Sequence, residues 1–190
     1  MALARFDLAG SGRLRVGMDA AIRPAREADA EAIAAIYNQG IEERQSTFET
    51  RPRTGAEIAE AMEPPDPVPF LVAEGSDGVL GWGRLARWSA RDCYSGVGEA
   101  SVYVERAARG RGLGRSLVEA LVTDARARGH WKLVGLLFPE NAASVALCKR
   151  TGFREVGVFE RHGQLEGAWR DVVIVERLLD PGGETGRAPG

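Results

Sequence analysis

Apolar residues recur at helical spacing in several parts of the chain, and this spacing predicts amphipathic helices. Residues 22–41 begin with a short strand-like segment, after which Ile33, Ile36, Tyr37 and Ile41 form one apolar stripe. Further helices are predicted over residues 55–62, over residues 113–128 and over the run NAASVALCKRTGF.

Other segments alternate between apolar and polar residues or are continuously apolar, which predicts strands. FLVAE and VLGWGRLARW flank the turn GSDG, and EASVYVE follows the loop SARDCYSGV. KLVGLLF is almost wholly apolar, as expected for a strand that is buried on both faces. EVGVFER and DVVIVERLL predict two final strands. This order predicts a single α/β (α+β) domain with a mixed, partly parallel central sheet flanked by helices.

The length of 190 residues favours one domain, and a hydrophobic content of 44% allows a sizeable core. We expect a flexible extension over residues 1–20, the folded domain over 21–180 and a disordered tail over 181–190. Met18 precedes the first well-patterned segment, so it is a candidate start, with a floppy terminus as the alternative.

The formal net charge of −2 gives no global argument for binding nucleic acid or an anionic membrane. No apolar run is long enough to span a bilayer, and the first residues lack the continuous apolar segment of a signal peptide. The cysteines and histidines have no metal-ligand spacing, so no metal is expected. Cys93 and Cys148 form no redox motif, and a reduced, cytoplasmic protein is expected.

A turn rich in glycine and arginine, RGRGLGRS, joins a predicted strand to a predicted helix. Glycines let the backbone approach a ligand, and the first N–H groups of a helix lack internal partners, so the turn favours phosphate. The dinucleotide pattern fails because Arg115 stands where a third glycine is needed, and a P-loop fails because no lysine lies here. The alternative is a glycine turn with solvated arginines.

The spacing Arg109-x-x-Gly112-x-Gly114 resembles the pyrophosphate loop of the GCN5-related N-acetyltransferases. ENAASVALCKRTGF resembles a later helix of that superfamily, with Asn141 and Ser144 in place, and the resemblance spans residues 22–179. IYN, TFET, GEASVYV, PENAAS and AWRDVVIVERLL resemble the phosphinothricin/arsinothricin N-acetyltransferase branch. The resemblance implies acetyl-CoA as cosubstrate, the free amine of a small amino-acid analogue as substrate, and a homodimer.

The resemblance also implies where acetyl-CoA binds. Its pyrophosphate would meet the turn formed by Arg109, Gly110, Arg111, Gly112, Leu113, Gly114 and Arg115. Its pantetheine arm would pair with the backbone of Val102, Tyr103 and Val104, although plain β-propensity also accounts for these residues. Asn141 would contact the cofactor, with a helix N-cap as the alternative.

Glu99 stands just before SVYV, where the resemblance implies the general base. An amine must be neutral to attack a thioester, and an α-amino group has a reference pKa of about 8, so a group is needed to accept its proton. A backbone N–H near Val104 would stabilise the oxygen that gains charge. The alternative is a surface glutamate that faces solvent.

Cys148 occupies the place where many superfamily members carry a tyrosine that protonates the departing thiolate. We interpret Cys148 as a small buried hydrophobe rather than as an acid. Tyr103 is the other phenol nearby in sequence, and its role is left open.

An acidic amino-acid analogue needs cationic contacts, and the planar fork of arginine suits oxyanions. Arg91 and Tyr94, in the loop before Glu99, are expected in the substrate pocket. Thr47 and Phe48, with Arg44, are expected to close its other side. Solvated surface charges are the alternative for the arginines. His162 either reaches a neighbouring subunit's pocket or has no role.

Three functions compete at this point. The leading hypothesis is acetylation of a small amino-acid-like amine. Acetylation of a protein N-terminus or lysine would need an open groove for a peptide. A non-catalytic acyl-CoA-binding module would bind the cofactor without turnover, and Glu99 argues against it.

Overall fold

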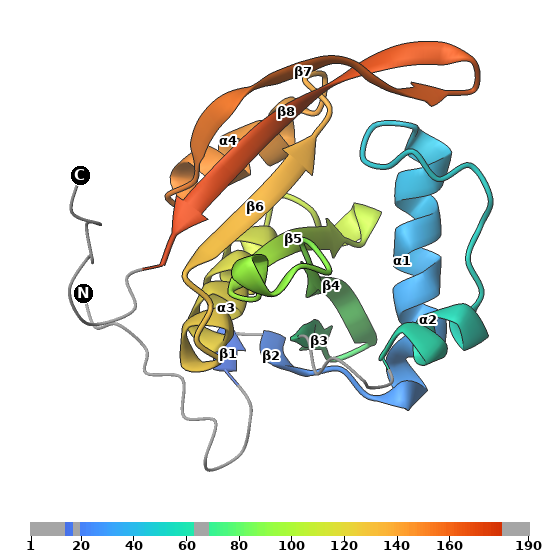
Figure 1. Ribbon diagram of the computed structural model, residues 1–190. Coiled ribbons are helices and arrows are strands. Elements are labelled where there is room, and N and C mark those ends of the chain that lie inside the picture. The colour runs from blue at the N-terminus through green and yellow to red at the C-terminus, as the bar shows by residue number, and fades with distance from the viewer. Residues whose placement is uncertain (1–13, 17–19, 63–68, 180–190) are drawn as a thin grey trace.

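The computed structural model describes residues 14–16, 20–62 and 69–179, which form one sheet with helices on both faces (Figure 1). The strands are β1 (Leu14–Val16), β2 (Ala20–Pro24), β3 (Phe70–Gly75), β4 (Gly78–Arg87), β5 (Val97–Val104), β6 (Lys132–Leu137), β7 (Arg154–Leu165) and β8 (Ala168–Leu178). The α-helices are α1 (Ala30–Glu43), α2 (Gly55–Met62), α3 (Leu113–Ala127) and α4 (Ala142–Arg150). Short 3₁₀ turns cover Glu27–Asp29, Asp92–Tyr94 and Arg106–Ala108.

The strand order is β1-β2-β3-β4-β5-β6-β8-β7, and among these neighbours only β5 and β6 run parallel. Their ladder is short, because it joins residues 97–99 to residues 132–134 and then stops. Beyond Glu99, β5 continues to Val104 and pairs with β4 alone within the described part of the chain. One edge of β5 is therefore open past the point where the two parallel strands part.

The two faces of the sheet are covered differently. Leu117 and Leu121 of α3 are fully buried against one face. A Cβ on Gly83 of β4 would lie 3.0 Å from Leu121, so glycine is what lets this helix approach so closely. On the other face, α1 and α2 bury Ile33 and Ile58 against β3 and β4. Figure 1 shows these two helices on the opposite side of the sheet from α3.

The predicted fold class is confirmed, and the predicted helices are found at α1, α2, α3 and α4. The sequence predicts a strand over EVGVFER, whereas β7 continues to Leu165 and leaves only residues 166 and 167 before β8. An irregularity in the pairing of β7 between Phe159 and Gly163 includes Arg161 at a φ of 48°, and His162 lies within this bulged part of the strand.

Within the expected extension over residues 1–20, Leu14–Val16 form β1 and pair antiparallel with β2. Met18 and the expected tail over 181–190 lie outside the described residues.

Candidate active site

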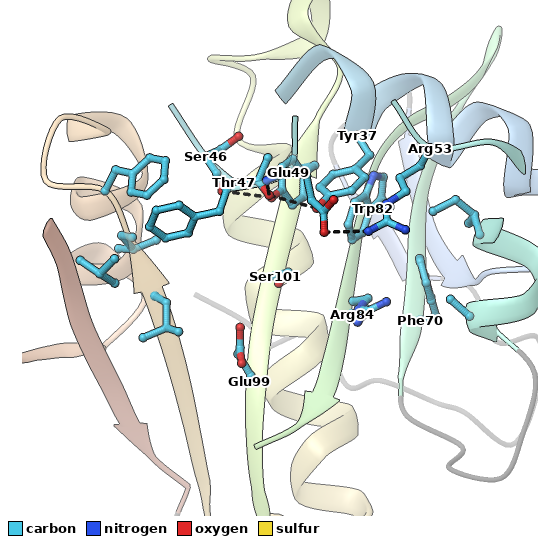
Figure 2. A pocket seen from close by; sticks show the side chains of 18 of the residues that line it. Tyr37, Ser46, Thr47, Glu49, Arg53, Phe70, Trp82, Arg84, Glu99 and Ser101 are labelled. Carbon is cyan, nitrogen blue, oxygen red and sulfur yellow. Dashed lines mark hydrogen bonds and ion pairs between the residues drawn. The ribbon is translucent and has the colours of Figure 1, made fainter. Parts of the chain in front are cut away.

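A cavity of about 540 Å³ lies on the face of the sheet that α1 and α2 cover. Its lining comes from α1, α2 and the segment between them, from β4 and β5, and from β6, β7 and β8. Of the residues expected to form the site, Glu99, Tyr103, Thr47 and Phe48 line this cavity. Figure 2 shows the cavity with the side chains that line it.

Alternate residues of β5 form the floor, because side chains two positions apart point to the same face of a strand. Glu99, Ser101 and Tyr103 line the cavity, whereas Val102 and Val104 pack against the core beneath α3. Glu99 is the last β5 residue that pairs with β6, so its carboxylate lies where the two strands part (Figure 2). Within the described residues this carboxylate has no hydrogen-bond or ion-pair partner.

Arg84 of β4 lies on the same floor and was missed by the sequence reasoning. It pairs across to Ser101 of β5, and its half-buried guanidinium likewise has no ion pair within the described part of the chain. The strand pattern of VLGWGRLARW could have revealed it, because side chains two positions apart point to the same face and Arg84 therefore lies on the same face as Trp82.

The segment after α1 closes the upper side of the cavity. The hydroxyls of Tyr37 and Thr47 lie 3.1 Å apart, and the ring of Phe48 packs edge-on against Phe138 with centroids 4.8 Å apart. Arg44 does not line the cavity; its Nη2 lies 2.8 Å from a carboxylate oxygen of Glu166 in the β7–β8 turn. The predicted closing side is therefore built by Thr47 and Phe48, while Arg44 ties the segment to the hairpin.

His162 lines the cavity of its own chain and stacks on Phe159 with ring centroids 4.7 Å apart. Neither sequence alternative described this position. It depends on the bulge in β7, which the local pattern does not reveal.

Arg91 and Tyr94 do not line this cavity, and their expected place in the substrate pocket stays a prediction. The 3₁₀ turn Asp92–Tyr94 leaves both side chains exposed, and the guanidinium of Arg91 lies 5.9 Å from the centre of the Tyr94 ring. The two side chains therefore lie next to each other at the surface of the protein.

The glycine turn presents open backbone, as predicted. Gly110 and Gly112 adopt positive φ values of 78° and 85°, and a Cβ built on either meets no atom within 4 Å. α3 begins directly afterwards without a side-chain cap, so its first N–H groups stay available. Arg111 and Arg115 are exposed and have no ion-pair partner among the described residues.

Arg109 behaves differently from its neighbours in the turn. Its guanidinium binds Glu43 of α1 at 2.9 Å and donates to the carbonyl oxygen of Val104 at 3.1 Å. Arg106 binds the same Glu43 carboxylate at 2.9 Å. The side chain of Arg109 is exposed but ties α1 to the turn through these contacts.

The open edge of β5 is formed by alternate residues. The N–H of Glu105 bonds to the carbonyl of Leu80 on β4, and antiparallel pairing alternates along a strand. The backbone groups of Tyr103 therefore face β4, whereas those of Val102 and Val104 face the open edge. Of the three residues expected to hold a pantetheine arm through their backbone, Val102 and Val104 face the right way and Tyr103 does not.

Asn141 caps α4, which is the alternative that the sequence left open. Its Oδ1 accepts from the N–H of Ser144 at 3.1 Å, and its Nδ2 donates to the carbonyl of Gln45 at 3.0 Å. Both polar ends of this amide are thus engaged within the protein.

Neither candidate donor to a leaving thiolate is well suited to that role. Burial raises the pKa of Cys148 to about 11, and its side chain packs against the core beneath α3, as interpreted from the sequence. Burial also raises the pKa of Tyr103 well above its ordinary value, and its hydroxyl donates to the carbonyl of Ser46 at 3.1 Å.

Within residues 14–16, 20–62 and 69–179, no group of three or more His, Cys, Asp or Glu side chains is arranged to hold a metal ion. None of the helices in this part of the chain has the length and apolarity needed to cross a membrane.

The sequence and the fold of the chain were compared with those of known proteins. Residues 22–174 match the family model described as "Acetyltransferase (GNAT) domain". The L-methionine sulfoximine/L-methionine sulfone acetyltransferase of Pseudomonas aeruginosa is 36% identical over 179 residues, covering 86% of this chain and 97% of that protein. The phosphinothricin N-acetyltransferase of Streptomyces viridochromogenes is 34% identical over 157 residues, covering 82% and 86%.

Solved structures agree with these relatives. A phosphinothricin acetyltransferase from Sinorhizobium meliloti, solved with acetyl-CoA, superposes with a TM-score of 0.80 at 29% identity, covering 85% of this chain and 89% of that one. A ribosomal-protein-alanine N-acetyltransferase from Brucella melitensis superposes equally well at 0.80 with 34% identity, covering 83% and 99%.

The chain therefore belongs to the GNAT family of acetyltransferases. It is an N-acetyltransferase, and its relatives include the phosphinothricin branch that the sequence resembles.

Proposed function

We propose that the protein transfers the acetyl group of acetyl-CoA to the free amine of a small amino-acid analogue. Phosphinothricin, arsinothricin and methionine sulfone represent the substrate class. The names of the relatives from Pseudomonas and Streptomyces support this class, and the Sinorhizobium structure with acetyl-CoA supports the cosubstrate. The catalytic domain would be residues 21–180 of a cytoplasmic protein.

One observation carries the proposal. Glu99 presents a carboxylate without a partner among the described residues, at the point where β5 leaves β6 and the cavity begins. The open edge of β5 leads from this carboxylate to the glycine turn at the start of α3. A coenzyme whose pyrophosphate meets the turn and whose arm pairs with Val102 and Val104 would bring its thioester toward Glu99.

The reaction needs no covalent enzyme intermediate. Glu99 accepts a proton from the ammonium form of the substrate, and the amine nitrogen then attacks the thioester carbon. An N–H of the open edge, at Val102 or Val104, stabilises the oxygen that gains negative charge. Glu99 has by then passed the first proton to water and takes the second proton from the attacking nitrogen, the carbon–sulfur bond breaks, the amide forms, and coenzyme A leaves as a thiolate that is protonated by water. No acid is assigned to this last step, since Cys148 and Tyr103 are both poor donors.

A second function has one observation in its favour. The Brucella protein is named for acetylating a ribosomal-protein alanine, and it is 34% identical to this chain. A peptide substrate would have to continue out of the cavity, whereas Phe48 packs across it toward Phe138. This ring contact at the cavity supports the small substrate.

We propose a homodimer as the working assembly. β7 is the outer strand of the sheet at 12 residues, and it exposes Val156, Val158 and Phe159. A long outer strand with exposed apolar side chains favours pairing with a second chain. Light scattering at micromolar concentration is expected to give the mass of a dimer, and a monomer mass would contradict it.

A substrate panel tests the function. Acetyl-CoA would be offered with phosphinothricin, arsinothricin, methionine sulfone and short peptides, and the released thiol would be followed. Turnover is expected with one or more amino-acid analogues. Turnover with peptides alone would establish the second function. Tight acetyl-CoA binding without turnover would instead favour a binding module.

A further inference from the structure

The charged side chains that line the cavity fall into two groups. Arg53 binds Glu49 at 2.7 Å. Glu57 binds Arg51 at 2.5 Å and lies 3.8 Å from Arg53, so each of these lining charges has a partner of opposite charge. Arg84 and Glu99 have no such partner among the described residues. One guanidinium and one carboxylate are therefore left facing the same empty space.

These two groups lie close together on the sheet. Arg84 pairs with Ser101, and Glu99 pairs with Ala86, so Arg84 and Glu99 are diagonal neighbours on adjacent strands. The Cα atoms of such neighbours lie about 7–8 Å apart. Figure 2 shows both residues on the floor of the cavity, with Ser101 beside them. An amino acid carries its amine and its carboxylate on one carbon, so a single small molecule can meet both side chains.

The surroundings of Arg84 strengthen its attraction for an anion. Phe70 of β3 pairs with Arg84 on the side away from Ser101, and Trp82 lies on the same face of β4. Apolar neighbours reduce competition from water, so a half-buried guanidinium without a partner carries a desolvation cost that a bound carboxylate would offset.

We infer that Arg84 binds the α-carboxylate of the amino-acid substrate while Glu99 receives the α-amino group. This inference rests on the proposed function, and it adds the residue that selects the substrate. A planar guanidinium holds a carboxylate through two parallel hydrogen bonds, which fixes the amine over Glu99. Amines without a neighbouring carboxylate, and peptides in which that carboxyl is an amide, are therefore poor substrates.

The test compares an acid with its amide. Methionine sulfone and its carboxamide would be assayed with wild type, Arg84→Met and Arg84→Lys. A charge-assisted hydrogen bond is worth enough to change kcat/KM by about 10–100-fold. Wild type is expected to prefer the acid by this factor. Arg84→Met loses the preference by losing activity on the acid alone, and Arg84→Lys keeps part of it.

Two further measurements make the test decisive. Arg87→Met removes an arginine of the same strand outside the cavity, and it is expected to keep the wild-type preference. Calorimetry measures binding of methionine sulfone without turnover, and Arg84→Met is expected to weaken that binding by the same factor.

The outcomes separate the inference from the function. If Arg84→Met affects acid and amide equally, or leaves the preference intact, Arg84 does not bind the carboxylate. Wild type that binds the acid through Arg84 but never acetylates it would reject the proposed function and keep the inference. Wild type that binds neither compound would overturn the inference, and the substrate panel would then decide the proposed function separately.

Discussion

Two groups of charged side chains lie on the same sheet, and they differ in whether the protein supplies their partners. Arg23 of β2 is 4% exposed, and its two terminal nitrogens bind Asp29 at 2.7 Å and Glu74 at 2.8 Å. Arg84 and Glu99, on β4 and β5, face the cavity without partners among the described residues. The first group is completed by folding, and the second is the group for which we propose a ligand.

The difference follows from where each group lies. Arg23 is next to the start of α1, so Asp29 at that start reaches it as soon as the helix packs. Arg84 and Glu99 line the cavity near the point where β5 and β6 part, and no other described residue forms an ion pair with either of them. We expect the same kind of substitution to affect turnover in one group and stability in the other.

The largest effect is expected at Glu99. Glu99→Gln keeps the shape of the side chain but removes the group that accepts the proton, and such assistance is worth about 10²–10⁴-fold in rate. Turnover should fall by that order, while the free energy of unfolding stays nearly unchanged because no internal contact is lost. Activity should partly recover at high pH, where the free amine exists without help. A pH–rate profile with the best substrate of the panel measures this.

Glu105→Gln is the matched control, because Glu105 follows the same strand and does not line the cavity. Its profile is expected to match wild type. Equal turnover of Glu99→Gln and wild type across neutral pH would mean that another group takes the proton. Glu99 would then have no role in turnover, and the proposed contrast between the two charge groups would fail.

The sequence predicted those parts of the site that depend on local chain geometry. The glycine turn needs only positive φ at Gly110 and Gly112 followed by a helix, and both features can be read from adjacent residues. Glu99 and the open edge belong to β5, the strand that precedes this turn in sequence. The fold class follows from the order of elements, because each element carries its own periodicity.

The parts that were missed depend on contacts between distant segments. The side chain of Arg109 binds Glu43, which lies 66 residues away in sequence. The side-chain amide of Asn141 donates to the carbonyl of Gln45, which lies 96 residues away. Arg84 becomes a site residue only through the pairing of β4 with β5, and His162 only through the bulge in β7. Local sequence patterns do not distinguish such polar residues, because a solvated arginine and a ligand-binding arginine have the same neighbours in sequence.

The next largest effect is expected at Asp29. Breaking a buried ion pair costs about 3–5 kcal/mol when the remaining charge has no other partner. Arg23 keeps Glu74, so Asp29→Asn should lower the free energy of unfolding by about the lower end of this range, while turnover per folded molecule is retained because Asp29 does not line the cavity. Chemical denaturation followed by an activity assay on the folded fraction measures both.

The pH dependence gives a second signature. The hydrogen bond from Arg23 is the main reason that the pKa of Asp29 lies below its ordinary value. Its stabilisation is thus fully present above the unfolded pKa of about 3.9 and is lost as the pH falls through the lower folded value. The difference in free energy of unfolding between wild type and Asp29→Asn should therefore become smaller as the pH falls.

Asp92→Asn is the control, because Asp92 forms an exposed ion pair with Arg87. This substitution should change the free energy of unfolding by about 0–1 kcal/mol.

The smallest effect is expected at the turn, where the two ends of α3 offer a comparison of their own. Gly112 precedes the helix with a φ of 85°, and Gly129 follows it with a φ of 83°. A Cβ on either meets no atom within 4 Å, so valine strains both backbones alike. The N–H of Gly129 already bonds to the carbonyl of Arg126, whereas the N–H groups after Gly112 have no capping side chain.

Gly112→Val and Gly129→Val should therefore lose similar stability but differ in affinity for acetyl-CoA. A side chain at position 112 stands in the open space where a pyrophosphate would approach the N–H groups, and losing such charge-assisted bonds weakens binding by about 10–100-fold. Gly129→Val should bind as wild type does, because its turn lies at the other end of the helix. Calorimetric titration with acetyl-CoA measures both constants. If both variants bind acetyl-CoA equally weakly, backbone strain is the cause. If a folded Gly112→Val keeps the wild-type affinity for acetyl-CoA, the pyrophosphate does not bind at this turn.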